Sequence, residues 1–138
     1  MQKYTMTASI IYQGELRCQA THLQSGTIIE TDAPTDNRGK GEKFSPTDTL
    51  CVALATCIIT TMALKASNMN IELKDTKIDV TKYMLKDPRR VGQIDVAIHF
   101  TALQLNEEQK NILETTGNNC PVAKSLHPDL KVNIEYNW

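Results

Sequence analysis

A run of apolar and small residues in the middle of the chain is its clearest pattern. From Thr49 to Leu64 there is no charged residue, no Gly and no Pro. A start signal precedes the run, because Ser45 can cap a helix, Pro46 suits the first helical position and Asp48 can complete a capping box. The run is apolar or small on every side and shorter than the ~20 residues that a membrane span requires. The pattern therefore predicts a buried central helix and no membrane segment.

The face of this helix that carries Cys57 is expected to point inward. Leu50 and Leu64 lie seven residues before and after Cys57, so the three side chains share one face. Cys51 lies off that face and is expected to be a core residue. A buried Cys is most often a small apolar core residue, and the helix alone favours that interpretation for Cys57 as well.

Segments with β-strand character precede the helix and predict an N-terminal β-meander, with turns near Gly14 and Gly26. Its expected strands are Met6–Gln13, Leu16–His22 and Thr27–Thr31. The stretch Asp32–Phe44 that follows has little apolar content and two Gly, and it is expected to be a loop that leads to the central helix.

After the helix, alternation predicts a hairpin of two strands, Ile71–Leu85 and Gln93–Leu103. A helix with a capping-box start is expected to run from Asn106 to about Thr116, where Gly117 ends it. The last elements are expected to be a short helix with Pro121 at its first position and a strand through Val132, Ile134 and Tyr136.

This order of elements predicts the α+β class and a single domain over residues 1–138. The domain combines the N-terminal β-meander, the buried central helix, a second β-hairpin, short C-terminal helices and a last strand. The central helix has few neighbours in its own chain to cover every face. A second copy of the chain can cover the remainder, so a homodimer is expected.

Composition narrows the functional classes. The chain has 138 residues, a net charge of −1, 41% hydrophobic and 22% charged residues, as is ordinary for a soluble globular protein. Without a basic cluster, neither nucleic acid nor a membrane surface is expected as a partner. The chain start lacks the apolar core of a signal peptide, so a cytoplasmic, reducing location is expected. The four cysteines show no metal-ligand spacing, and no metal or cofactor is predicted.

For two of the four cysteines, a physical argument supports a reactive thiol. Cys120 directly precedes Pro121, so it lies at a helix N-terminus, where unpaired N–H groups favour a thiolate, and Lys124 adds positive charge. The spacing supports an unreactive capping Cys equally well. Cys57 gains nothing from a helix end and needs a cation from elsewhere, for which Arg38 and Arg17 are the candidates.

Taken together, these motifs resemble the OsmC/Ohr family of osmotically inducible and organic hydroperoxide resistance proteins. The residues that carry the resemblance, which extends from Tyr4 to Tyr136, are Glu30–Pro34, the stretch Gly39–Asp48 before the Ala-rich helix with Cys57, and Asn119-Cys120-Pro121-Val122. The resemblance implies an OsmC-like fold, an intertwined homodimer with two interface active sites, and a thiol peroxidase that reduces organic hydroperoxides. Cys57 would attack the peroxide, Cys120 would resolve the oxidised sulfur, and a dithiol reductant would reset the pair.

One position departs from the family pattern. In the family an Arg from the loop before the central helix pairs with a Glu just after the Pro, and Arg38 fits the first position approximately. Thr47 occupies the Glu position, and the neighbouring Asp48 points about 100° away around the helix. Because this Glu is missing, a second function is also considered. In this alternative the chain is a non-enzymatic protein that binds a small apolar ligand in the dimer-interface pocket. A purely structural dimer is the third possibility.

Overall fold

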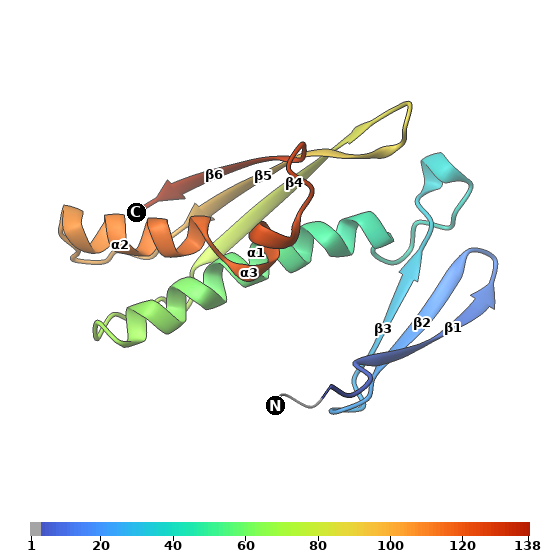
Figure 1. The fold of residues 1–138 in the computed structure, drawn as a ribbon, viewed down its shortest axis with the longest axis horizontal. Coiled ribbons are helices and arrows are strands. Elements are labelled where there is room, and N and C mark those ends of the chain that lie inside the picture. Colours follow the sequence, from blue (N-terminus) through green and yellow to red (C-terminus); the bar gives the residue numbers. More distant parts are fainter. Residues whose placement is uncertain (1–3) are drawn as a thin grey trace. The chain divides into compact units, whose positions relative to one another are not determined.

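The computed structural model describes residues 4–138 and confirms the α+β class (Figure 1). The chain separates into two compact units. The N-terminal unit ends at Thr49, and the C-terminal unit spans Leu50–Trp138. The predicted domain over 1–138 also includes residues 1–3, which lie outside the described residues.

The N-terminal unit contains the predicted meander. Strands β1 (Ala8–Gly14), β2 (Arg17–His22) and β3 (Ile28–Asp32) form an antiparallel sheet in that order. A single 3-10 turn, η1 (Thr35–Asn37), lies in the loop that follows. Arg38 ends this turn in the left-handed conformation, with φ of 62°.

Helix α1 (Pro46–Ser67) begins as its sequence predicts. The Ser45 backbone N–H donates to Asp48 Oδ2 at 2.9 Å, and the Asp48 N–H donates to Ser45 Oγ at 3.0 Å, which completes the capping box. At 22 residues α1 is long and apolar enough to cross a membrane by length and composition alone. Core helices of soluble proteins pass the same test, and α1 packs into a core.

The buried face of α1 differs from the predicted one. Leu64 is 69% exposed within the chain and Cys57 is only half-buried, so the expectation that their shared face points inward is wrong. Because α1 is apolar nearly all round, its pattern does not identify the inner side. Cys51 is buried, as predicted. The inward residues of α1 are Cys51, Leu54, Ala55, Ile58, Met62 and Ala66.

The C-terminal unit is built on the sheet β4 (Lys77–Leu85), β5 (Arg90–His99) and β6 (Lys131–Asn137). β4 and β5 form the predicted hairpin, and β6 pairs in parallel with β5. The prediction that the first strand begins at Ile71 is wrong. A turn in which Asp75 adopts φ of 71° precedes β4, so pairing starts only at Lys77.

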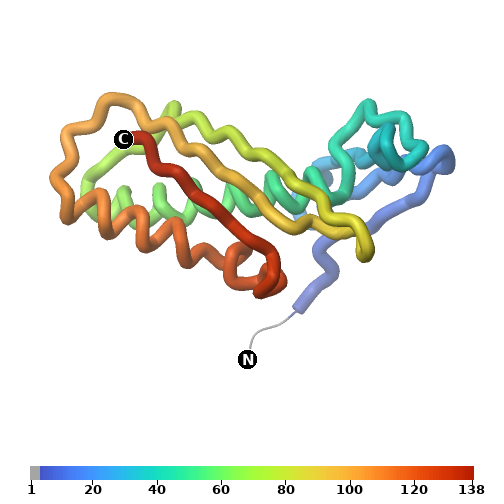
Figure 2. Tube along the Cα trace, turned by 90° about the horizontal axis from the view of Figure 1, so that it is seen from above, coloured from blue at the N-terminus to red at the C-terminus, as the bar shows by residue number. Residues whose placement is uncertain are grey.

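Two further helices lie on the same face of this sheet as α1 (Figures 1 and 2). α2 (Glu107–Asn118) has the predicted capping box at Asn106, and α3 (Pro121–Ser125) begins at Pro121. α2 passes through Gly117, so the prediction that this Gly ends the helix is wrong. A Cβ at Gly117 would lie 2.7 Å from the Tyr136 hydroxyl, so this Gly allows close packing.

Candidate functional site

The C-terminal unit brings Cys57 of α1 together with Cys120 at the start of α3. The Val122 backbone N–H, in the first turn of α3, and the Cys120 thiol lie close enough to the Cys57 sulfur to act as hydrogen-bond partners on its pKa. On α1 itself, the Thr61 hydroxyl lies 3.8 Å from Cys57 Sγ. Both cysteines are free thiols. The two cysteines that the sequence singles out therefore lie beside each other.

Polar contacts counteract the burial of Cys57. Burial alone raises the pKa of a thiol, because it disfavours the charged form. Here the Val122 N–H, the Thr61 hydroxyl and the Cys120 thiol outweigh burial, and the pKa of Cys57 lies below its ordinary value. The groups responsible are neutral hydrogen-bond partners. Cys57 thus gains thiolate character from the first turn of α3 even though it lies mid-helix.

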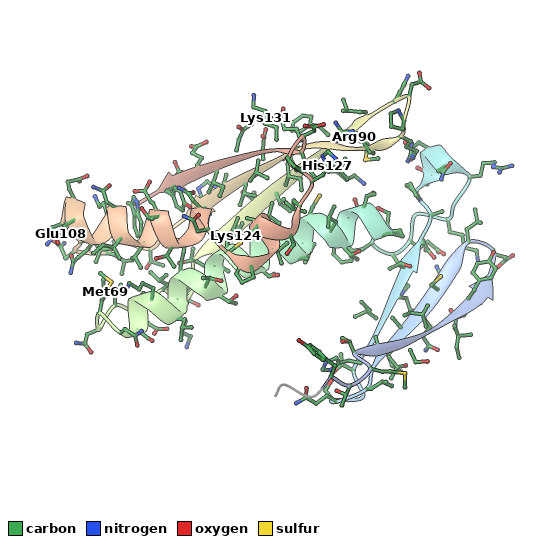
Figure 3. The ribbon with its side chains drawn as sticks, in the orientation of Figure 1. Met69, Arg90, Glu108, Lys124, His127 and Lys131 are labelled. Atoms are coloured by element: carbon green, nitrogen blue, oxygen red, sulfur yellow. The ribbon has the colours of Figure 1, made fainter. Side chains whose placement is uncertain are left out.

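Cys120 has the opposite character. It is fully buried and caps α3, and its sulfur accepts the Ala123 N–H at 3.4 Å. Burial, with the neighbouring Cys57 as a further cause, raises the pKa of Cys120 despite the N–H bonds that favour its thiolate. The predicted charge at Lys124 belongs to an exposed side chain on α3 (Figure 3). The site therefore pairs a thiol with lowered pKa and a buried thiol with raised pKa.

The N-terminal unit holds a separate ionic cluster. Arg17 Nε and Nη2 donate to the two oxygens of Asp32 at 2.6 and 2.8 Å, and Nη2 also reaches Glu42 Oε1 at 2.9 Å. Asp32 is 1% exposed and also accepts the backbone N–H groups of Glu42 and Lys43. The Arg17 guanidinium, with these N–H groups, lowers the pKa of Asp32 to about 2. The Arg17 guanidinium is thus held in a bidentate ion pair with Asp32.

The remaining predicted site residues also lie in the N-terminal unit. Arg38 stands at the end of η1, and within residues 4–138 no ion pair of Arg38 is found. Asp48 serves the capping box. The hydroxyl of Thr47, which occupies the position of the family Glu, lies 3.2 Å from Ser45 Oγ.

Sequence reasoning missed four members of these two clusters. Asp32 and Glu42 are separated from Arg17 by 15 and 25 residues, and no local signal joins them. Thr61 was within reach of inference, because it follows Cys57 by four residues and so lies on the same helix face. The Val122 N–H follows from a helix start at Pro121, but its approach to α1 depends on tertiary packing. Among residues 4–138 no group of three His, Cys, Asp or Glu is placed to hold a metal ion.

A hollow of about 470 Å³ lies beside α3 in the C-terminal unit. Ala123 of α3 and Leu126, the residue after its last turn, line the hollow on one side, and Val132 and Ile134 line it from β6. Asn118 and His127 supply polar groups at its wall. The volume falls in the range of small-molecule sites, and most of its lining residues are apolar.

Comparisons with known proteins identify the family and the fold of the chain. The OsmC-like protein family matches residues 39–135. A crystal structure from Psychrobacter arcticus, named for an osmotic stress induced and detoxification response protein, is 45% identical, with a TM-score of 0.93 over 99% of this chain and 98% of that chain. No curated protein matches.

More distant structures share the fold. The organic hydroperoxide resistance protein OsmC of Legionella pneumophila is 16% identical, with a TM-score of 0.77 over 100% of both chains. The organic hydroperoxide resistance protein OhrB of Bacillus subtilis is 18% identical, with a TM-score of 0.67 over 96% of this chain and 98% of that chain.

Proposed function

Because the chain belongs to the OsmC-like protein family, we propose that it is a thiol-dependent peroxidase that reduces organic hydroperoxides with Cys57 and Cys120. The observation that carries the proposal is the contact between two free thiols whose pKa values shift in opposite directions. The names of the Legionella and Bacillus neighbours, which refer to organic hydroperoxide resistance, support the substrate class.

The proposed cycle uses each thiol once. The Cys57 thiolate attacks one peroxide oxygen and breaks the O–O bond, which gives a sulfenic acid on Cys57 and, after protonation, an alcohol. The Cys120 thiol then attacks the sulfenic sulfur, a disulfide forms and water leaves. A dithiol reductant from solution returns both cysteines to thiols by exchange and becomes a disulfide itself.

The different environments of the two cysteines suit these roles. Attack on a peroxide requires the thiolate, and the lowered pKa of Cys57 increases its thiolate fraction near neutral pH. The raised pKa of Cys120 keeps that buried group a thiol until the sulfenic acid forms beside it. The peroxide-attacking role therefore falls to Cys57, although the sequence alone gives Cys120 the better activated position.

The two candidate cations, Arg17 and Arg38, differ in how firmly each is held within the N-terminal unit. A guanidinium can stabilise the leaving oxygen of a peroxide, provided that its position is fixed. Asp32 and Glu42 fix Arg17 in the N-terminal unit, whereas no such partner holds Arg38 within residues 4–138. The catalytic roles predicted for Arg38 and Asp48 stay predictions.

The homodimer is part of the proposal, because the N-terminal sheet leaves apolar side chains uncovered. Ile10, Ala20 and Ile29 are paired across the three strands and therefore share one face, and both isoleucines are more than half exposed within the chain. Tyr12 and Cys18 continue this face along the sheet. A second copy that covers the face would bury it and place two active sites at the interface. We expect this dimer to be cytoplasmic.

Stopped-flow oxidation of the reduced protein tests the function. We expect cumene hydroperoxide to be consumed much faster than hydrogen peroxide, with mass spectrometry identifying a Cys57–Cys120 disulfide as the product. C57S should abolish fast consumption, and C120S should stop at the sulfenic acid after one turnover. Thiols that react no faster than free cysteine would overturn the proposal.

The hollow beside α3 favours one alternative function, the binding of a small apolar ligand without catalysis. In that case peroxide would leave both thiols unmodified. A fluorescent fatty acid would instead bind, and substitution of Val132 by a charged residue would weaken its binding.

A further inference from the structure

The threonines of α1 differ in what their hydroxyl groups contact. The hydroxyl of Thr56 donates to the Val52 carbonyl at 2.7 Å, and that of Thr60 donates to the Thr56 carbonyl at 2.8 Å. This is the common arrangement for Thr inside a helix, where the side chain bonds the carbonyl four residues earlier. The Thr61 hydroxyl lies instead 3.8 Å from Cys57 Sγ.

Helix geometry places the two side chains of this contact next to each other. Thr61 follows Cys57 by four residues, so the two side chains are neighbours on one helix face. The β-branched side chain of Thr61 has two main rotamers in a helix, and in this structure, where Thr61 is half-buried, its hydroxyl is directed to Cys57 Sγ. The Cys57 sulfur therefore lies between a hydroxyl on its own helix and the Val122 N–H of α3.

We propose that Thr61 is a positioning residue whose hydroxyl donates a hydrogen bond to the Cys57 sulfur and holds it toward the first turn of α3. This inference rests on the proposed peroxidase function, because the sulfur so held is the one assigned to attack the peroxide. Held in this way, the sulfur faces the N–H of Val122 and the thiol of Cys120, which must reach it after oxidation.

The electrostatics of the site agree with a donated bond. Burial is the largest influence on Cys57 and opposes its thiolate, and the Thr61 hydroxyl is among the groups that reverse the effect on the pKa. The titratable group that acts on Cys57 within the C-terminal unit is Cys120. Loss of one neutral donor should therefore leave the remaining partners in place and weaken the thiolate by a measurable amount.

The test replaces single hydroxyl groups on α1. T61V keeps the branched shape and removes the hydroxyl, T61S restores the hydroxyl, and T60V removes a neighbouring hydroxyl that bonds only backbone carbonyls. The readout is the rate at which iodoacetamide alkylates Cys57 across pH 5 to 10, resolved by peptide mass spectrometry. No peroxide is present, so this readout is independent of peroxidase activity.

We expect T61V to slow alkylation of Cys57 at neutral pH about threefold to tenfold, and to move the alkylation midpoint to higher pH. T61S should return the wild-type profile, and T60V should leave it unchanged. A wild-type profile for T61V would overturn the inference, as would equal shifts in T61V and T60V. Should T61V fail to fold by circular dichroism, T61A is measured in its place under the same criteria.

Peroxide consumption is measured on the same samples. Slow oxidation of the wild-type protein would overturn the proposed function whatever the alkylation profiles show. Fast oxidation together with unchanged profiles would overturn only the role of Thr61.

Discussion

The N-terminal and C-terminal units are stabilised in different ways. In the N-terminal unit, the buried residues among those described are Asp32 and Ser45, both polar, and the isoleucines of its sheet are exposed within the chain. The C-terminal unit has a continuous apolar core, which joins α1 and α2 to the sheet. Ion pairs and capping hydrogen bonds connect the segments of the N-terminal unit, but they bury little apolar surface. The C-terminal unit buries its own apolar face.

This difference is relevant to the location of the chemistry. The two thiols belong to the unit with the apolar core, where packed helices fix α1 and α3. Both candidate cations, Arg17 and Arg38, belong to the unit that depends on charge contacts and on an additional apolar cover. We therefore expect the contact between the two thiols to form within a single chain. The apolar face of the N-terminal sheet, in contrast, is expected to be buried only when a second copy covers it.

The largest expected effect is on the core of the C-terminal unit. I58A removes most of a fully buried side chain and should lower the free energy of unfolding by about 2–5 kcal/mol. Urea unfolding followed by the fluorescence of Trp138, which stacks on Phe100 in this unit, provides the measurement. L64A, on the exposed face of the same helix, should cost less than about 0.5 kcal/mol. A loss below about 1 kcal/mol for I58A would contradict the assignment of the core, and a large loss for L64A would show that the second copy buries that face.

The next effect concerns the apolar face of the N-terminal sheet. Replacing both Ile10 and Ile29 with Ser removes two large apolar side chains from one face and should weaken self-association at least about tenfold. Sedimentation velocity over a range of concentrations provides the measurement. I11S is the matched control, because Ile11 lies on the opposite face beside Gln19 and Glu30. Equal dissociation by I11S, or none by the double variant, would contradict the proposed interface.

Local signals predicted much of this fold. Both capping boxes follow from residues three positions apart, because a helix start involves only its own first turn. The strand order of the meander and of the β4–β5 hairpin follows from alternation and turn residues. The joint site of Cys57 and Cys120 was implied by family resemblance rather than derived from spacing.

The remainder depends on contacts between distant residues. The inner face of α1 could not be read from its sequence, because Leu64 and Ile58 are both apolar and only the packing of the sheet distinguishes them. From the sequence, Gly117 is expected to end a helix. In the structure its lack of a side chain instead allows Met62 and Tyr136 to pack against it. The partners of Arg17 lie far along the chain, so the sequence alone gave no reason to prefer Arg17 over Arg38, which fits the family position approximately.

The smallest expected effect is a pH dependence confined to the N-terminal unit. The Arg17 guanidinium lowers the pKa of Asp32 to about 2, against about 3.9 for an unfolded Asp. The folded state therefore binds this proton less readily than the unfolded state does. The stabilisation by Asp32 is fully present above about pH 4, and it is lost as the pH falls toward 2.

The backbone amides of Glu42 and Lys43 report this titration directly, because both donate to Asp32 Oδ2 at 3.1 Å. Their proton chemical shifts should change together, with a midpoint near pH 2. In D32N both transitions should disappear and the melting temperature at pH 5 should fall. E42Q, which removes only the exposed partner of Arg17, should keep the transitions and change the melting temperature less. A midpoint near pH 4 would show that Arg17 does not pair with Asp32 in solution. The statement that ion pairs stabilise the N-terminal unit would then be wrong.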